Sequence, residues 1–467
     1  MNDFITTLLG VKESEVEYCK ETVKNRKHTF YIRLVNRGQR CPECGYYTRE
    51  IKEYRNKHIT HSVLLNETSE ILYNARRFLC PKCGKTFYED NPFTEQYSRI
   101  SDKTVENVLA LLKNYNETFS SVAKKVNLSA QKVMNIFDEH VQIGRKELSE
   151  SIGIDEFYFS RHASKKYALM VLSLNKGYVI DLLPSRDKHR LHSYFHRIPK
   201  EEREKVKFIS IDMNENYRDV LYSCFPNAKI CADPFHVVRR VFDSLDRIRL
   251  SLLRKFENDK RSDQYYLLKY QKHLLFEEIQ YQNYSDVKKN HHFKYHLTDL
   301  QKRNMLLSIS GDLERSYYLC QRYKSFDRSL GSPIEKAEEL DLIINKMFDS
   351  QITELVSLAA TLLNWHIEII NSFFTISKRV SDHNGNSFRK TVRVTSGPVE
   401  GRNKYIKIII RLANGFSNFD RFRNRALYVL NKNDSPSDMR IENSVTRHFP
   451  KKQKMDTINK HRVTLRL

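Results

Sequence analysis

The chain has 467 residues, more than one compact core usually holds, so we expect several domains. Lys and Arg (80) exceed Asp and Glu (57), for a net charge of +23 at pH 7. This favours a polyanionic partner, nucleic acid above all, although a merely soluble basic protein is the alternative. Apolar runs stay shorter than the roughly 18 residues of a membrane span, and the N-terminus lacks a signal-peptide pattern. We therefore expect a cytoplasmic protein with no membrane partner.

Two Cys-Pro-x-Cys-Gly segments, CPECG and CPKCG, predict a metal site in the N-terminal region. Their cysteines are Cys41, Cys44, Cys80 and Cys83. Each tight turn directs two sulfurs to one point, and Gly45 and Gly84 permit the positive φ that closes it. Four thiolates complete the tetrahedral set of a structural Zn²⁺. A redox C-x-x-C pair is the alternative, which the two glycine-ended turns disfavour.

Residues 1–95 are predicted to form this zinc-binding, β-rich N-terminal domain. Strand-like stretches lie at residues 16–19, 28–35, 58–65 and 70–78. Many basic residues surround the cysteines, and together they predict a phosphate-contacting surface, with a solvated charged face as the alternative. They are Arg40, Arg49, Lys52, Arg55, Lys57, Arg76, Arg77, Lys82 and Lys85.

Residues 96–145 are predicted to form a helix-turn-helix DNA-binding domain. Ser101 is a candidate N-cap for a helix over residues 102–116, a short helix spans 119–125, and Ser129 caps a last helix over 130–141. This layout would place the last helix in the DNA major groove. Its outward residues predicted to contact DNA are Ser129, Gln131, Lys132 and Asn135. A three-helix packing module without a DNA role is the alternative.

Residues 150–245 alternate between strand-like and helical patterns. Strands are predicted at 152–159, 167–174, 178–183, 206–213 and 228–233, with helices at 187–197 and 216–225. This βββαβαβ order is that of a ribonuclease H-like α/β core, here its first part. Asp155 lies on the first strand and Asp212 at the end of the fourth. Because these strands would be neighbours, both carboxylates could reach one metal ion.

The remaining chain divides into three predicted parts. Residues 246–370 are Leu-rich, charged and helical, and predict an all-helical insertion domain; Trp365 near its end is expected in the core, with stacking on DNA as the alternative. Residues 371–430 form the second part of the catalytic core, with a helix that Ser396 can cap and that carries Glu400 in its first turn. Residues 431–467 are a basic C-terminal tail predicted to touch DNA.

Asp155, Asp212 and Glu400 together suggest a site for two Mg²⁺ (or Mn²⁺) ions. Two such ions can activate the attacking oxygen and stabilise the leaving oxygen during displacement at phosphorus. Arg402 and Lys404, which follow Glu400, are predicted DNA contacts. Two alternatives stay open: a catalytically inactive DNA-binding regulator on the same scaffold, and a structure-selective nuclease.

The chain resembles the DDE transposases of bacterial insertion sequences, of the ISL3 family, from about residue 40 to 430. The matching stretches are CPECG, CPKCGKTF, IDEFYF, DLLPSRDK, ISIDMNENY, PNAKICADPFHVVRRV and TSGPVEGRNKYIKIIIRLANGFSNFDRFRNR. The resemblance implies that Asp155, Asp212 and Glu400 are the metal-binding triad. It also implies Mg²⁺-dependent strand cleavage and strand transfer, with double-stranded DNA, both terminal inverted repeats and target, as the substrate.

Further implications of the resemblance concern the neighbourhood of the triad and the assembly. Asp233 and His236 would form an accessory motif, for which a purely structural helix cap is the alternative. Pro234 departs from the arginine usual in that motif, so the DNA contact of that arginine is not carried over. A homodimer and a bacterial, nucleoid-associated location are also implied.

Overall fold

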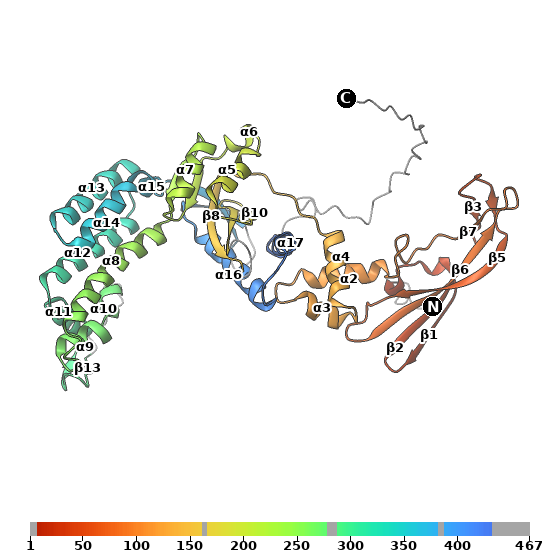
Figure 1. The fold of residues 1–467 in the computed structure, drawn as a ribbon, viewed down its shortest axis with the longest axis horizontal. Coiled ribbons are helices and arrows are strands. Elements are labelled where there is room, and N and C mark those ends of the chain that lie inside the picture. Colours follow the sequence, from red (N-terminus) through yellow and green to blue (C-terminus); the bar gives the residue numbers. More distant parts are fainter. Residues whose placement is uncertain (1–6, 161–165, 278–286, 382–386, 432–467) are drawn as a thin grey trace, which may run out of the picture. The chain divides into compact units, whose positions relative to one another are not determined.

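The computed structural model describes residues 7–160, 166–277, 287–381 and 387–431. Its described part divides into two compact units, one of residues 7–113 and 119–144 and one of residues 114–118 and 145–431 (Figure 1). The basic tail predicted to touch DNA lies, apart from Asn431, outside the described residues. In the described ranges, no helix combines the length and the apolar character needed to cross a membrane.

The first unit contains a twisted sheet with strand order β1-β2-β6-β5, and β7 pairs with β6. Its elements are η1 (Glu13–Glu15), β1 (Val16–Lys24), β2 (Lys27–Leu34), β3 (Gln39–Arg40), β4 (Tyr47–Thr48), β5 (Ile51–Thr60), β6 (Thr68–Leu79) and β7 (Thr86–Tyr88). The strands predicted at 28–35 and 70–78 are confirmed. The strand predicted at 58–65 instead ends at Thr60, because His61 and Ser62 bond to Ser101 and Thr104 at the start of the next helix.

Three helices complete the first unit: α2 (Asp102–Leu112), α3 (Phe119–Lys125) and α4 (Ala130–His140). The two predicted N-caps are confirmed, since the side chain of Ser101 accepts from Thr104 N–H and that of Ser129 from Lys132 N–H. The buried ring of His61 bonds to Ser101 Oγ (2.8 Å) and thereby ties the sheet to the start of α2.

The second unit is built on a five-stranded sheet with strand order β10-β9-β8-β11-β12. Its strands are β8 (Ser151–Tyr158), β9 (Tyr167–Ser173), β10 (Val179–Leu183), β11 (Phe208–Ile211) and β12 (Lys229–Ala232). The pairs β8–β9 and β9–β10 are antiparallel, whereas β8–β11 and β11–β12 are parallel. All five predicted strands are therefore present, in the predicted chain order.

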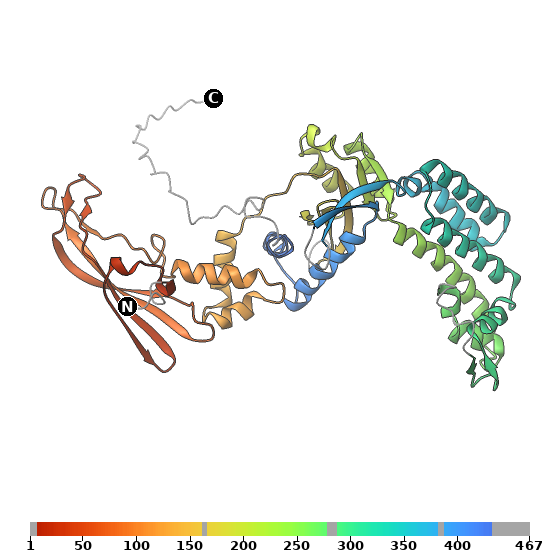
Figure 2. The same cartoon turned by 180° about the vertical axis from the view of Figure 1, so that it is seen from behind.

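Helices cover both faces of this sheet (Figure 2). On one face Ile152, Ile154, Ile209 and Ile211 join a core with α5 (Lys188–His196) and α7 (Glu215–Cys224); the short α6 (Lys200–Arg203) lies between those helices in the chain. Because side chains alternate along a strand, Gly153 and Ser210 point to the opposite face, where they meet α16 (Gly397–Leu412) and the residue before it.

The helical region after the sheet shares the core of that sheet. The elements are α8 (Pro234–Lys255), α9 (Asp263–Tyr270), α10 (His273–Phe276), β13 (Lys288–Lys289), β14 (His296–Leu297), α11 (Asp299–Leu307), α12 (Gly311–Arg328), α13 (Pro333–Asp349), α14 (Thr353–Asn364) and α15 (His366–Asn371). Helix α8 runs without a break through residue 245, where the helical insertion was predicted to begin. Trp365 is buried, as expected, beneath the guanidinium of Arg218, 4.5 Å from the ring centroid.

The last part adds a hairpin that the sequence did not reveal, β15 (Thr375–Ser381) with β16 (Ser387–Arg393), before α16 and α17 (Phe419–Leu430). Ser396 is the N-cap residue of α16, as predicted, but its side chain makes no capping hydrogen bond; its hydroxyl bonds to Ser210 Oγ instead (2.7 Å). From α17, the buried Arg425 donates to the carbonyls of Asn114 and Glu117, which assigns the short segment 114–118 to this unit.

Candidate functional site

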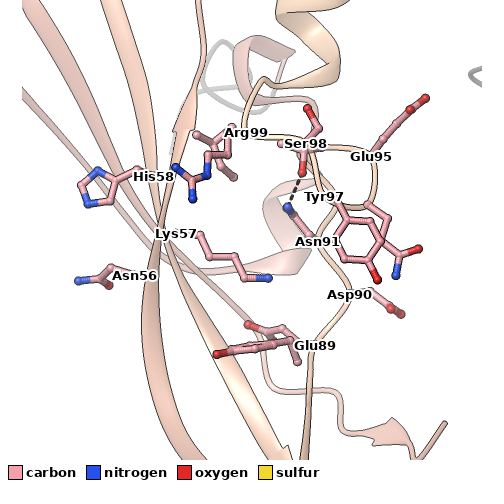
Figure 3. A pocket seen from close by; sticks show the side chains of 14 residues that line it. Asn56, Lys57, His58, Glu89, Asp90, Asn91, Glu95, Tyr97, Ser98 and Arg99 are labelled. Atoms are coloured by element: carbon pink, nitrogen blue, oxygen red, sulfur yellow. Dashed lines mark hydrogen bonds between the residues drawn. The ribbon is translucent and has the colours of Figure 1, made fainter.

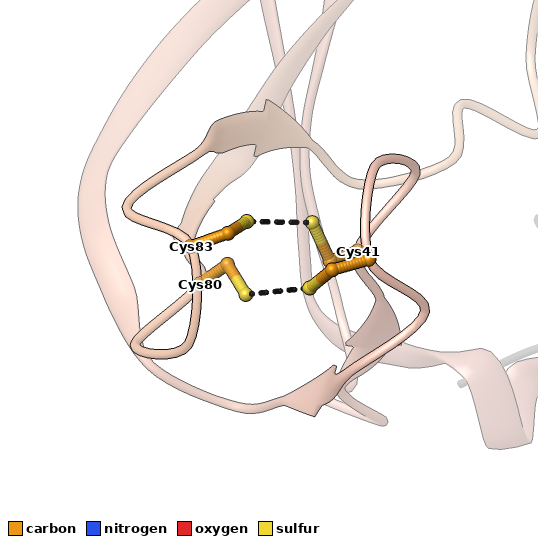
Figure 4. A group of neighbouring side chains, drawn as sticks. Cys41, Cys80 and Cys83 are labelled. Carbon is orange, nitrogen blue, oxygen red and sulfur yellow. Dashed lines mark hydrogen bonds between the residues drawn. The ribbon is translucent and has the colours of Figure 1, made fainter.

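The four predicted zinc ligands converge at the end of the first unit (Figure 4). The sulfurs of Cys41 and Cys83 lie 3.6 Å apart and those of Cys44 and Cys80 3.5 Å apart. In each turn the glycine after the second cysteine, Gly45 or Gly84, has φ near +70° and donates its N–H to the carbonyl of the first cysteine. These sulfur separations suit a tetrahedral Zn²⁺ with Zn–S bonds of about 2.3 Å.

The basic residues near the cysteines differ more than expected in their surroundings. Arg76 is buried and forms ion pairs with Glu17 and Glu89, so it belongs to the fold and not to the predicted phosphate-contacting surface. Arg77 pairs with Glu53 (2.9 Å). Alternation along β6 does not explain the buried position of Arg76, because Ile71, Tyr73 and Ala75 form the buried face and Arg76 follows Asn74 on the other one. Sequence composition alone does not distinguish such an arginine from a surface one.

Three aspartates lie in a row across the sheet of the second unit. The strand register pairs Ser210 with Gly153 on β8 and Ile211 with Ala232 on β12. Continued for one or two residues, it sets Asp212 beside both Asp155 and Asp233. Adjacent strands are about 4.8 Å apart, so these carboxyl groups lie close together at the strand ends, on the face covered by α16.

Nearby positive charge compensates this row only in part. Burial, together with the neighbouring charges of Asp155 and Glu156, raises the pKa of Asp212 to about 6, although His236 and Arg240 act to lower it. Burial likewise raises the pKa of Asp155, even though Glu156 N–H and Asn403 Nδ2 donate to its two oxygens (2.8 and 2.7 Å). Asp212 Oδ1 is buried and has no hydrogen-bond partner among the described residues. Such a group is costly to bury unless a cation joins it.

Asp233 and His236 extend the site at the third strand. Asp233 directly precedes α8, but its side chain makes no capping hydrogen bond there. Its Oδ1 instead accepts from Ser396 N–H (3.2 Å), and its Oδ2 lies 3.7 Å from His236 Nε2. Asp233 thus occupies the N-cap position of α8 and makes a further contact beyond that helix. The carboxylate anchors the chain just before α16 to the end of β12.

Glu400 lies one turn before Asn403 on α16, the helix that contacts Asp155. Its side chain is 59% exposed and lies 3.9 Å from Lys404 Nζ. Within the described ranges, Asp155, Asp212 and Glu400 are not among the groups whose ligand atoms all lie within 4.8 Å of one another. The structure thus brings the aspartates together and sets the helix of Glu400 beside them, with the Glu400 side chain turned to solvent.

Two residues that shape this site escaped prediction. Asn403 holds Asp155, and its only signal in the sequence is its position three residues after Glu400, on the same helix face. Gly153 allows α16 to approach β8, since a Cβ there would lie 2.5 Å from Val399 Cγ2. A glycine two residues before Asp155 in an apolar strand is the corresponding signal.

The donor set of the aspartate row fits a hard divalent cation. The row offers carboxylate oxygens, one of them buried and unpartnered, and Mg²⁺ or Mn²⁺ prefers such oxygens with water completing the coordination. Asp155 and Asp212 would hold the cation, and Glu400 would reach it by a change of side-chain rotamer or a shift of α16. Four thiolates in the first unit, by contrast, suit Zn²⁺.

The residues predicted to contact DNA have different surroundings. Ser129, Gln131, Lys132 and Asn135 are all exposed on one end of α4, where Ser129 is also the N-cap and Gln131 donates to Asn135. In the second unit Lys404 is exposed. Arg402 is bound within the fold, because its guanidinium donates to the carbonyls of Gly177 (2.8 Å) and Leu430 (3.3 Å).

A cleft of about 1050 Å³ lies in the first unit between β5 and the segment after β7 (Figure 3). Lys57, His58 and Arg99 line it from one side, but Glu89, Asp90 and Glu95 line it as well. This mixed charge does not favour a polyanion, so the cleft is not assigned to the candidate site.

Comparison with known proteins decides the family. A family model described as a transposase, that of the ISL3-type DDE transposases, matches residues 152–426, which include the whole aspartate row and Glu400. The chain belongs to the ISL3 family of transposases. The resemblance inferred from the sequence motifs is thereby confirmed.

Two relatives of this ISL3-family chain are transposases of named insertion sequences. The transposase for insertion sequence element IS1001 of Bordetella parapertussis is 22% identical over 240 residues, which cover 50% of this chain and 58% of that protein. The transposase for IS1557 of Mycobacterium tuberculosis is 32% identical over 125 residues, 27% of each chain. The matches thus span less than two thirds of either relative.

Proposed function

We propose that this ISL3-family chain is a DDE transposase that cuts and joins DNA at the ends of an insertion sequence, using divalent cations on a ribonuclease H-like core. The sheet order, with three antiparallel strands followed by two parallel ones, supports this core. Family membership and the relatives' names support the substrate.

The observation that carries the proposal is the row of Asp155, Asp212 and Asp233, with an unpartnered buried oxygen on Asp212. Buried, mutually repelling carboxylates are costly to the fold and are typical of sites that bind cations. When bound, two divalent ions would activate an attacking oxygen and neutralise the leaving oxygen at phosphorus.

The protein's own groups take distinct roles in this proposal. Asp155 and Asp212 hold the cations, and Glu400 completes the set from α16. Asn403 Nδ2 and Glu156 N–H each donate to one oxygen of Asp155 and thereby fix the orientation of its carboxylate. Asp233 fixes the start of α16 through Ser396 and thereby sets where Glu400 can reach. His236, whose Nε2 lies 3.7 Å from Asp233 Oδ2, forms the accessory motif of this proposal together with Asp233.

We assign binding of the element ends to the first unit, with residues 1–95 as the zinc-binding part and residues 96–145 as a helix-turn-helix. The exposed end of α4 supports this, because its polar side chains are not used in packing. The domains proposed for the rest are residues 150–245 and 371–430 for the catalytic core and residues 246–370 for the helical insertion. A homodimer that holds both element ends remains a prediction.

The decisive experiment compares Asp212→Asn with Asp219→Asn on a duplex carrying an element end. Asp219 is an exposed carboxylate on α7, paired with Lys188, and serves as the matched control. We expect Mg²⁺-dependent nicking to fall on the order of 10³-fold or more in Asp212→Asn, because several kcal/mol of cation stabilisation are lost. DNA binding should stay unchanged in both variants. Full nicking by Asp212→Asn would refute the site, and no nicking by the wild type would favour the inactive regulator.

The DNA-reading role of α4 is tested with Lys132→Ala. A phosphate contact removed from B-DNA should weaken binding at every sequence and lower the slope of log K against log salt by about 1. Lys207→Ala, which removes an exposed lysine paired with Glu150 in the other unit, is the control. An unchanged slope in Lys132→Ala would remove this residue from the interface.

A further inference from the structure

A second group of metal-ligand side chains lies in the unit that carries the aspartate row. His192 and His196 on α5 and Cys224 at the end of α7 each offer one ligand atom, and these atoms all lie within 4.8 Å of one another. In the described ranges only this group and the four zinc-ligand cysteines of the first unit meet that condition. The group is separate from the aspartate row, because α7 begins just after Asp212 and Cys224 is its last residue.

The histidine pair is arranged as a chelate. Residues four apart on a helix lie on the same face, so His192 and His196 are adjacent there. Their rings stack with centroids 4.6 Å apart and an interplanar angle of 18°. His196 is exposed and His192 is at least partly exposed, so both rings can rotate at little cost. The pair alone resembles many surface histidines; the third ligand distinguishes it.

Cys224 is held rigidly beneath this pair. The edge-to-face contact of Phe195 with Phe225, with centroids 4.9 Å apart, packs α5 against the end of α7 next to both sets of ligands. Arg203 on α6 donates to the carbonyls of Cys224 and Ile198, which fixes the backbone at the cysteine. Cys224 is buried whereas His196 is exposed, so a metal bound here would have protein on one side and water on the other.

The geometry points to a three-ligand site: we propose that His192, His196 and Cys224 bind a Zn²⁺ ion whose fourth position is open to water. Tetrahedral Zn²⁺ with Zn–N near 2.0 Å and Zn–S near 2.3 Å separates its ligand atoms by about 3.3–3.6 Å. The ligands therefore close by about 1 Å, which rotation of the two histidine rings supplies. Imidazole and thiolate together select Zn²⁺ or Co²⁺ over Mg²⁺.

Binding would join α5 to α7 on the face of the sheet opposite the aspartate row. The thiol of Cys224 loses its proton to solvent as the Zn–S bond forms, and nothing is oxidised or reduced. Because α7 starts directly after Asp212, the ion would fix the far end of the helix that follows this carboxylate. The site is thus expected to stabilise the second unit without taking part in chemistry at phosphorus.

The test measures metal content and cobalt spectra on the full chain, using His196→Ala and Cys224→Ala, with His189→Ala as the matched control. His189 is an exposed histidine of α5 outside the cluster. After removal of loosely bound metal, the wild type and His189→Ala should hold about two Zn²⁺ per chain, and the two cluster variants about one. A wild type with a single ion, absent from the variant Cys41→Ser with Cys83→Ser, would overturn the proposal.

Cobalt distinguishes a lost ligand from a lost fold. In the Co²⁺-loaded chain, Cys224→Ala and His196→Ala should both lose the absorption of the second cobalt, including its single thiolate-to-cobalt band, and keep the absorption of the four-cysteine site. His196→Ala replaces an exposed side chain, so its fold is expected to be retained and is checked by circular dichroism. Cobalt spectra identical in wild type and both variants would also refute the site.

Discussion

The four cysteines of the first unit and the carboxylates of the second differ in how closely the fold brings the candidate ligands together. In the first unit four sulfurs lie at bonding separations of 3.5–3.6 Å within each facing pair. In the second unit Asp155 and Asp212 are adjacent and half-buried, but Glu400 is 59% exposed on a neighbouring helix. The thiolates come from two local turns whose shape is fixed by glycine, whereas the carboxylates come from segments 245 residues apart, since 400 − 155 = 245.

The fold has already assembled the four cysteines, whereas the carboxylate site needs a movement of Glu400 or of α16 to be complete. A four-thiolate set needs only the two turns and the strands that carry them. The carboxylate set depends on how closely α16 packs on β8, which Gly153, Asn403 and Asp233 together control. Substitutions should therefore act on folding in the first unit and on positioning in the second.

The largest effect is expected from Cys80→Ser. A structural Zn²⁺ contributes on the order of 10 kcal/mol to folding of a small domain, so loss of one buried thiolate should unfold the region around the cluster. Hydrogen exchange in β6 and β7 would reveal it, together with the zinc content. Cys19→Ser, a cysteine of β1 outside the cluster, is the control and should change neither. Full zinc content in Cys80→Ser would contradict the four-thiolate assignment.

The next largest effect is a pH dependence of stability, whose sign should differ between the two units. Burial lowers the pKa of His61 to about 4, below the roughly 6.5 of an unfolded chain, so the unfolded state binds more protons between these values. The first unit should lose roughly 3 kcal/mol of stability as pH falls from 6.5 to 4. In His61→Asn, which keeps an acceptor for Ser101, most of this loss should vanish.

The measurement is the urea concentration at which β5 and α2 lose hydrogen-exchange protection, taken at pH 7 and pH 4. The stability of the second unit, which carries the carboxylate site, should depend on pH with the opposite sign. The pKa of Asp212 is raised to about 6, so its ionisation destabilises the folded state as pH rises from about 4 to 6. Equal pH dependence in wild type and His61→Asn would exclude His61 as the cause.

A smaller effect is expected from Gly153→Ala, which tests whether packing of α16 controls the second site. The added Cβ would meet Val399 and Leu174 at 2.5 and 2.8 Å, and relief of this overlap should cost about 1–3 kcal/mol. Nicking should fall more than DNA binding, since α16 carries Glu400. Gly311→Ala, at the start of α12 with open space around its Cβ position, should leave both unchanged. Equal nicking by the two variants would show that the approach of α16 is not limiting.

The smallest expected effect is a pH-dependent cation affinity. Mn²⁺ must displace a proton from Asp212 below its pKa of about 6, so affinity should rise about tenfold per pH unit up to that value and then level off. Mn²⁺ titration by calorimetry between pH 5 and 8 measures it. In Asp212→Asn the remaining affinity should be weak and nearly independent of pH; a retained steep dependence would assign the proton to another group.

Local patterns predicted much of this molecule, and the failures have a common physical origin. The knuckles, the caps Ser101 and Ser129 and all five strands of the second unit follow from short-range signals. Tertiary contacts decided the rest: Ser396 bonds to Ser210 instead of capping, and Arg76 is paired in the core. The hairpin of β15 and β16 was missed because its residues are basic and polar, with little of the alternation that marks a half-buried strand.

The buried guanidinium of Arg425 has a practical consequence for dividing this protein into pieces. Its acceptors are main-chain oxygens of Asn114 and Glu117, far upstream of the rest of the second unit. A polypeptide that began at residue 145 would leave the buried guanidinium of Arg425 without those acceptors, which would lower the free energy of unfolding by several kcal/mol. One that began at residue 114 would keep them. A truncated version of the protein should therefore keep residues 114–118, between α2 and α3, and not begin at the apparent domain boundary near residue 145.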